Sequence, residues 1–175
     1  TLVAFAAQGR EIKLDEERIQ GYRHFINKMW NAARFALMHV DTVDERAIAV
    51  VDHPADLHLA HRWIMSRTAA TVRDVRRGLD EYHFNEVASA NYQFIWHEFC
   101  DWYLELIKAD LFSDDELAKQ QAQGVLLVVL ETILKLMHPL TPFVTEEIWS
   151  VLPGERSTLM NSSFPELRQD WLDPE

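Results

Sequence analysis

Hydrophobic residues recur at helical spacing along almost the whole chain, and this spacing is typical of amphipathic helices. No segment alternates apolar and polar residues for long, so we expect little or no sheet. Pro139 ends one helical pattern, and Thr141 followed by Pro142 is typical of the start of the next. The expected helices cover about residues 15–39, 56–82, 87–109, 115–138 and 142–152. We therefore predict an all-α fold, an antiparallel helix bundle with four long helices plus a short fifth.

The segments around these helices are predicted to be less regular. Residues 41–55 are polar and are expected to form a loop, and residues 153–175 lack a clear period. Residues 1–8 resemble the tail of a helix that stops at Gly9, with a short connector over 10–14. Apart from this, five tryptophans are expected to lie in the core: Trp30, Trp63, Trp96, Trp102 and Trp149.

Composition narrows the class of protein. The chain has 175 residues, of which 48% are hydrophobic and 26% charged, a balance typical of one globular domain. The lone cysteine, Cys100, excludes a disulfide framework and suits a reducing compartment. The longest purely apolar run, residues 125–130, is far too short to span a bilayer. Because the chain begins without Met and in mid-pattern, we expect it to be an excised module.

The charge is distributed unevenly. The formal net charge is −11, which argues against a nucleic-acid partner. However, residues 1–77 hold 12 basic and 10 acidic residues, whereas residues 78–175 hold 5 and 18. Residues 18–40 contain four Lys or Arg and no acidic residue. This stretch is either a local binding surface or an ordinary solvated helix face.

The sequence contains no convincing catalytic or metal site. None of its glutamates is followed by a histidine three residues later, as a di-iron bundle would require. His58 and His61 share a helix face without a suitably spaced carboxylate, so surface or capping roles are expected for the histidines. Cys100 lies between aromatic residues and is expected to be a buried structural thiol. We therefore expect no catalytic residue, metal or cofactor in this segment.

The first long helix has one face with a distinct chemistry. At 100° per residue, Arg23, Asn27, Asn31, Arg34, Phe35 and Lys28 fall on the side opposite an apolar stripe centred near 260° from Arg23. Basic groups neutralise phosphates, amides pair with base edges, and an exposed ring stacks on unpaired bases. This face fits single-stranded RNA. In the alternative interpretation, Phe35 lies at the edge of the core and Arg34 pairs with an acid of a neighbouring helix.

Several motifs resemble the anticodon-binding domain of class I aminoacyl-tRNA synthetases. Residues 27–35 (NKMWNAARF) resemble the motif that opens this domain, and residues 62–67 (RWIMSR) resemble a second stretch of it, although His61 stands where the family usually has Asp. Residues 138–149 (HPLTPFVTEEIW) match a third segment. Residues 94–105 (FIWHEFCDWYLE) are similar to the valyl subgroup, as are residues 6–14 and 158–165. The motifs keep the family order along essentially the whole chain.

The resemblance implies a function and a division of the chain. It implies a valine–tRNA ligase that joins valine to tRNA(Val) with ATP and Mg, in the cytoplasm and away from membranes. The catalytic and editing sites would lie outside this segment. Residues 1–14 would end the connector from the catalytic core, residues 15–152 would form the anticodon-binding domain, and residues 153–175 would extend towards a coiled coil. The partners would be the anticodon stem-loop and the catalytic core of the same chain. The rival hypothesis is a helical protein-interaction module without RNA binding.

The resemblance also favours particular residues of the first helix. It implies RNA contacts by Lys28, Arg34 and Phe35, which match the family motif. We expect Phe35 to stack on a base, Arg34 to contact a base or phosphate, and Lys28 to donate to a base edge or phosphate. Secondary roles are expected for Asn27 and Asn31, as polar contacts, and for Arg18 and Arg23, which would steer the backbone.

Overall fold

The protein is an all-α helix bundle in a computed structural model that describes residues 2–5, 16–41 and 43–172. Within these ranges no strand is present, which confirms the predicted fold class. The helices are α1 (Leu2–Phe5), α2 (Glu16–Val40), α3 (Glu45–Ala49), α4 (Leu59–Asp80), α5 (Phe84–Gln93), the π-helix η3 (Phe94–Tyr103), α6 (Leu104–Leu106), α7 (Lys108–Leu111), α8 (Glu116–Met137) and α9 (Pro142–Ser150).

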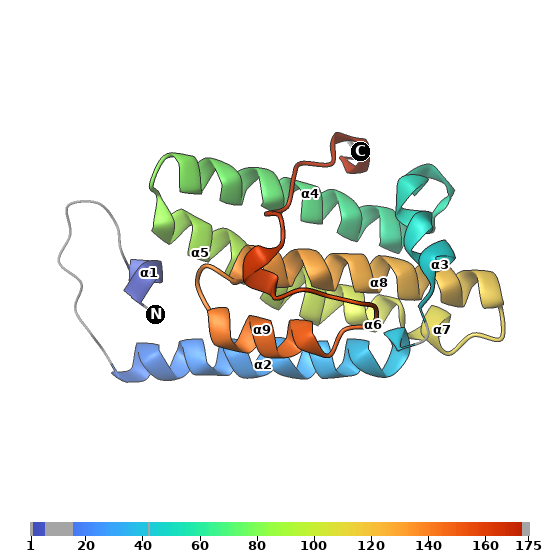
Figure 1. The fold of residues 1–175 in the computed structure, drawn as a ribbon, viewed down its shortest axis with the longest axis horizontal. Coiled ribbons are helices and arrows are strands. Elements are labelled where there is room, and N and C mark those ends of the chain that lie inside the picture. The colour runs from blue at the N-terminus through green and yellow to red at the C-terminus, as the bar shows by residue number, and fades with distance from the viewer. Residues whose placement is uncertain (1, 6–15, 42, 173–175) are drawn as a thin grey trace.

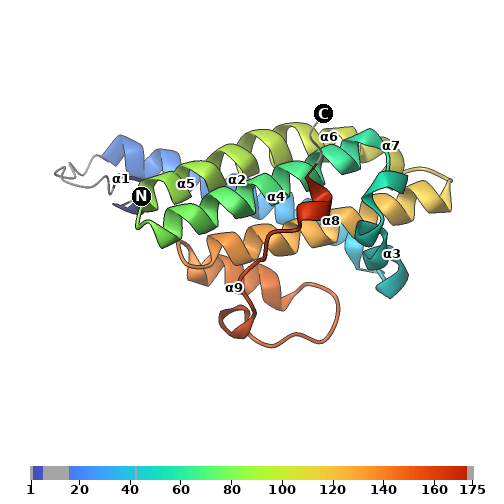
Figure 2. The same cartoon turned by 90° about the horizontal axis from the view of Figure 1, so that it is seen from above.

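Four long rods make up the bundle. They are α2, α4, the continuous rod α5–η3–α6, and α8, and successive rods run in opposite directions (Figure 1). Helix α8 packs against α2, α4 and α9, and η3 packs against both α2 and α4. Seen from above, α4 lies beside the α5–η3–α6 rod, while α9 lies on the outer side of α8 (Figure 2). This arrangement leaves one side of α2 facing away from the bundle.

Helix α8 is the central element of the core. Eleven of its residues are buried, from Ala122 to Met137. A helix that is apolar on most sides needs neighbours on most sides, and α8 has them in α2, α3, α4, α7 and α9. The Asp115 carboxylate caps this helix by accepting hydrogen bonds from the amides of Leu117 and Ala118.

The segment predicted as a polar loop over residues 41–55 contains helical turns instead. It includes α3 and two 3₁₀ turns, η1 (Val50–Asp52) and η2 (Pro54–Asp56). Asp44 caps α3 through the amides of Arg46 and Ala47. The backbone of α3 approaches α8 at Gly124, where an added Cβ would lie 1.8 Å from the carbonyl oxygen of Ala47. Because only glycine allows this approach, the polar segment can cover one end of α8.

The third rod departs from regular α-helical geometry. Leu104 donates its amide hydrogen to Phe99 O, five residues earlier, which is the hydrogen bond of a π-helix. The wider turn shifts the buried positions by one residue. Tyr103 and Ile107 are therefore fully buried, whereas Trp102 and Leu106 are 63% and 49% exposed. The prediction that Trp102 belongs to the core is wrong for this reason.

The short fifth helix and the chain that follows it are held by side chains of the third family motif. Pro142 occupies the first turn of α9 as predicted, but the Thr141 hydroxyl donates to Met137 O and does not cap the helix. The Glu146 carboxylate accepts the amide hydrogen of Leu159, and the indole of Trp149 donates to Ser157 O. These residues fix the path of the C-terminal segment.

Two further 3₁₀ turns lie in that segment, η4 (Leu159–Asn161) and η5 (Gln169–Trp171). Trp171 is buried, and its indole donates to Val51 O of η1. Of the residues predicted to form a helix tail at the N-terminus, Leu2–Phe5 form α1. Residues 1 and 6–8, Gly9 and the connector over 10–14 lie outside the described residues. None of the helices in the described ranges combines the length and hydrophobicity needed to cross a membrane.

Candidate nucleic-acid interface

The orientation of α2 decides which of its side chains face outward. Its buried residues are Phe25, Met29, Ala32, Ala33, Ala36 and Val40. At 100° per residue these residues centre at about 230° from Arg23, about 30° away from the predicted stripe. The rotation turns Trp30 outward, where it is 37% exposed, so its predicted place in the core is wrong. The same rotation brings the opposite edge of α2, which carries Lys28 and Phe35, towards the bundle.

Four of the predicted RNA contacts lie on the outward side of α2. Arg23, Asn27, Asn31 and Arg34 are all exposed, and they span about 80° of the helix surface. Their centre lies opposite the buried set. Arg18 also belongs to α2, but its side chain lies outside the described residues. The exposed strip therefore offers two guanidinium groups and two amides to a partner.

Lys28 leans sideways from this strip onto η3. Its ammonium group forms an ion pair with Asp101 and lies over the indole ring of Trp96, with Nζ 4.0 Å from the ring centroid. The Lys28 side chain remains 27% exposed, and the Asp101 side chain 41%. The predicted donor is thus accessible, but it already has a carboxylate and an aromatic partner.

Phe35 is half-buried and packs against the hydrophobic core. One side of its ring meets His39, with 4.8 Å between centroids, and His39 in turn meets Phe112 at 5.1 Å. Phe112 is 70% exposed. The ring of Phe35 is therefore anchored at the edge of the core, which combines a fixed orientation with partial access.

Two polar contacts tie η3 to α4. Glu98 accepts two hydrogen bonds from Arg67, from Nε and Nη2, each 2.8 Å long. This hydrogen bond to Glu98 raises the pKa of Arg67. His61, which we expected at the surface, is fully buried, and a 3.0 Å hydrogen bond joins its Nδ1 to the hydroxyl of Tyr103. Burial lowers the pKa of His61 to about 4, against the opposing effect of Asp110.

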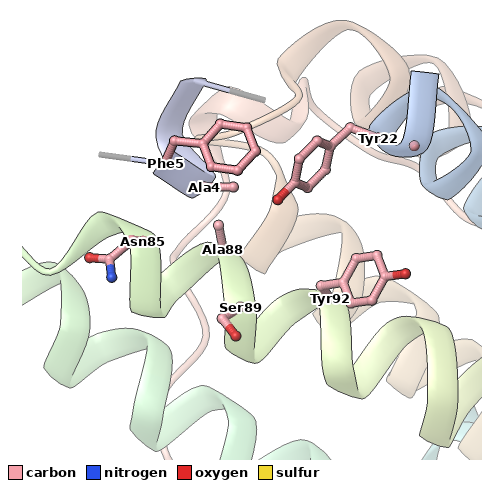
Figure 3. Close-up of a pocket in the computed structure, with 8 residues that line it drawn as sticks. Ala4, Phe5, Tyr22, Asn85, Ala88, Ser89 and Tyr92 are labelled. Carbon is pink, nitrogen blue, oxygen red and sulfur yellow. The ribbon is translucent and has the colours of Figure 1, made fainter. Parts of the chain in front are cut away.

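Other potentially reactive groups do not assemble into a site. Cys100, which we expected to be buried, is half-buried, and this burial raises the pKa of its thiol to about 12. Among the described residues, no three His, Cys, Asp or Glu side chains gather as metal ligands would. A cavity of about 430 Å³ lies between α1, α2 and α5, where Phe5 and Tyr22 meet edge to face (Figure 3). Its described lining is aromatic, small or amide-bearing and includes no carboxylate, imidazole or amine side chain.

The surroundings of Lys28 include residues to which the sequence alone assigns no role. Asp101 and Trp96 contact Lys28 but lie about seventy residues further along the chain. Both residues lie in the family motif of residues 94–105, but that motif alone does not predict a contact with the first long helix. No spacing in the sequence points to these contacts, because apolar residues fill residues 94–107 too densely to show which of them are buried.

An all-α bundle that presents basic, amide and aromatic side chains from one outward helix has the features of an RNA-binding domain. Residues 61–175 match the family described as the anticodon-binding domain of tRNA ligase. The chain belongs to this family. The matched range contains the motifs of α4, η3 and α9, and α2 precedes it.

Relatives extend the similarity over α2. The chain is 69% identical to a valine–tRNA ligase of Desulfotalea psychrophila over 175 residues, which is 100% of this chain and 20% of the relative. It is 53% identical to the valine–tRNA ligase of Syntrophotalea carbinolica over 94% of the chain and 18% of the relative. For the Geobacter sulfurreducens ligase the identity is 49%, over 94% of the chain and 19% of the relative. The chain thus spans about a fifth of the length of these curated relatives.

Proposed function

We propose that this chain is the tRNA anticodon recognition module of a valine–tRNA ligase. The outward strip of α2, together with Lys28 and Phe35 at its edge, would read the anticodon of tRNA(Val), whose middle and third bases are A and C. Three findings support the proposal: the family match, the identity to valine–tRNA ligases across α2, and the exposure of Arg23, Asn27, Asn31 and Arg34. The observation that carries it furthest is the half-buried ring of Phe35 next to exposed Arg34.

The chemistry of recognition follows from these side chains. Bases of an anticodon loop leave their stack and expose both faces and edges. Phe35 offers a ring whose orientation is held by the core and by His39. Arg34 can stack or donate several hydrogen bonds, and Asn27 and Asn31 can donate to and accept from base edges. Arg23, and Arg18 on the preceding turns, would neutralise backbone phosphates.

The remaining assignments concern the parent enzyme. We assign residues 15–152 to the RNA-reading bundle, residues 1–14 to the connector from the catalytic core of the same chain, and residues 153–175 to an extension. Valine activation with ATP and Mg, aminoacylation and editing would belong to other parts of that enzyme, with no cofactor held by this segment. The place of action would be the cytoplasm, where tRNA is charged.

The decisive experiment is a binding titration of this chain with tRNA(Val) and with the same tRNA carrying a changed middle anticodon base. We expect tighter binding to the unchanged tRNA. Replacing Phe35 by Ala should weaken that binding by about 1–3 kcal/mol, the value of one base stacked on an aromatic side chain. Phe84→Ala is the matched control, because it removes another partly exposed ring, 40% accessible, from the start of α5.

The outcomes separate the site assignment from the function. Equal binding of both tRNAs by the parent chain would favour the rival, a protein-interaction module. If the parent chain discriminates between the two tRNAs and Phe35→Ala binds tRNA(Val) as tightly as the parent, Phe35 is not part of the site. The proposed function would then still stand.

A further inference from the structure

We propose that Asp101 is a positioning residue for RNA recognition. Its carboxylate neutralises and orients Lys28, so that Lys28 contributes to reading the anticodon and adds little to indiscriminate phosphate binding. This inference rests on the proposed function and extends it to a residue of η3. It is carried by the contacts of Lys28, the geometry of the π-helix and the rigidity of the surrounding aromatic cluster.

The π-helix explains how two groups on one rod meet the same lysine. In an α-helix, residues five apart point in directions about 140° apart. In a π-helix, the i→i+5 hydrogen bond brings such residues onto the same side. Trp96 and Asp101 are separated by five residues within η3, and both contact the ammonium group of Lys28. Such π segments frequently occur at functional sites.

The carboxylate of Asp101 is itself fixed in direction. Lys28 pairs with its Oδ1, and Nδ1 of His97 lies 3.3 Å from Oδ2. Both oxygens are therefore engaged, although the side chain is 41% exposed. The acid can hold the lysine in place without closing it off from a partner.

Trp96 forms the other wall of the cradle. Its ring stacks on Tyr92, with 5.5 Å between centroids and 16° between planes, and lies 6.4 Å from Phe25. Phe25 is buried in the core. Because the indole is wedged among these rings, the position of Nζ over it is determined by the fold.

The charge balance at Lys28 favours recognition of a base edge over binding of a phosphate. A lysine ammonium has three donors and binds phosphate as a point charge. Pairing with Asp101 cancels most of that charge, so a passing phosphate gains little from Lys28. The ammonium still has donors for a base-edge acceptor in the correct position. Asp101 would therefore increase the difference between a matching anticodon and a wrong one.

The test is the Asp101→Asn variant, which keeps the side-chain volume and removes the charge. Binding of this chain to a hairpin RNA with the valine anticodon, and to the same hairpin with a changed middle base, is measured over a series of salt concentrations. We expect the changed hairpin to bind more tightly, and its slope of log K against log salt to steepen by about 0.7, as one extra single-strand phosphate contact requires. The ratio of the two affinities should fall about five-fold.

Three further variants make the result specific. Glu105→Gln is the matched control, because its carboxylate also pairs with a lysine, Lys108, at 2.6 Å, so the same charge is lost and a lysine is also released. In a Lys28→Met background, Asp101→Asn should have no effect on the ratio. Asp101→Glu keeps the negative charge, so the changed hairpin should still bind weakly to this variant. If Asp101→Asn does not fold, the affinity ratio of Asp101→Glu still tests the proposal.

The proposal is overturned if Asp101→Asn leaves the affinity ratio unchanged while the parent chain discriminates. It is equally overturned if the effect persists in the Lys28→Met background or if Glu105→Gln reproduces it. A parent chain that binds both hairpins equally contradicts the proposed function and this inference together, whereas the other outcomes contradict the inference alone.

Discussion

The π-helix η3 contacts two neighbouring helices through polar pairs of different kinds. Towards α4, Glu98 holds Arg67 through two hydrogen bonds, and Tyr103 bonds to the fully buried His61. Towards α2, Asp101 holds Lys28 through a single ammonium group that stays partly open to solvent. The α4 side of η3 thus has one buried contact and one two-pronged contact, whereas the α2 side has a contact through a single donor group.

The difference separates contacts that hold the fold from a contact that a ligand can share. A guanidinium fork fits a carboxylate bidentately, which fixes the directions of its other donors, while an ammonium group that pairs through one donor can still turn its other two. The α4 side therefore stabilises the bundle. The α2 side stabilises it little, because exposed single pairs contribute about 0–1 kcal/mol, and it retains donors for RNA. Changes on the two sides should separate stability from binding.

The largest effect on stability is expected at the buried contact, from a change in pH. The pKa of His61 is lowered from 6.5 to about 4, first by burial, so between these values the unfolded chain binds a proton that the folded chain does not. The contribution of His61 to the free energy of unfolding is complete above pH 6.5 and is lost as the pH falls. By pH 4 the loss should reach about 3 kcal/mol.

Urea unfolding of the parent and of His61→Gln at pH 7 and pH 4.5 measures this loss. The variant lacks the titrating ring, so its stability should fall less between the two pH values. Equal losses in both proteins would show that His61 does not cause the acid sensitivity, and that the α4 side is not the pH-sensitive side of η3.

A smaller effect is expected from Arg67→Lys, which converts the two-pronged contact into a single one. A lysine supplies one point charge where the guanidinium donates two hydrogen bonds of 2.8 Å to Glu98. Because the Arg67 side chain is 47% exposed, the loss in the free energy of unfolding should be about 1 kcal/mol. RNA discrimination should stay at the parent value. Arg73→Lys is the control, because Arg73 pairs only with its neighbour Asp74 among the pairs described for it.

The sequence predicts the bundle well because the fold depends mainly on local spacing. Apolar periodicity and Pro142 locate the four rods and α9, and the bounds agree to within a few residues. The sequence did not reveal α3, because Ala47 is its only buried residue and its docking depends on Gly124 of a distant helix. It also did not reveal η3, because a period of 3.6 residues was applied where the chain has a wider turn.

The candidate site was predicted in composition but not in contacts. The helical wheel correctly places Arg23, Asn27, Asn31 and Arg34 on the outward side of α2. It cannot reveal that Lys28 meets Asp101, because that pair joins residues far apart in the chain and depends on the rotation of α2. Lys28 belongs to the motif of residues 27–35 and Asp101 to the motif of residues 94–105. The structure connects the two motifs, because the lysine of one pairs with the carboxylate of the other.

The smallest effect on stability is expected from Lys28→Arg, which makes the α2 side resemble the α4 side. A guanidinium at this position can donate to both oxygens of Asp101, sharing Oδ2 with His97, and its plane can stack on the ring of Trp96, over which the ammonium group now lies. The free energy of unfolding should rise by about 0.5 kcal/mol. The remaining donors would then be held in fixed directions by the contact with Asp101 and could not turn towards a base edge, so the affinity ratio between matching and changed hairpins should fall although the net charge is the same. Thermal unfolding and the hairpin titrations measure both quantities on one protein. An unchanged affinity ratio in this variant would mean that only the positive charge at position 28 matters for recognition. The contacts on the two sides of η3 would then differ in how much they stabilise the bundle, and not in function.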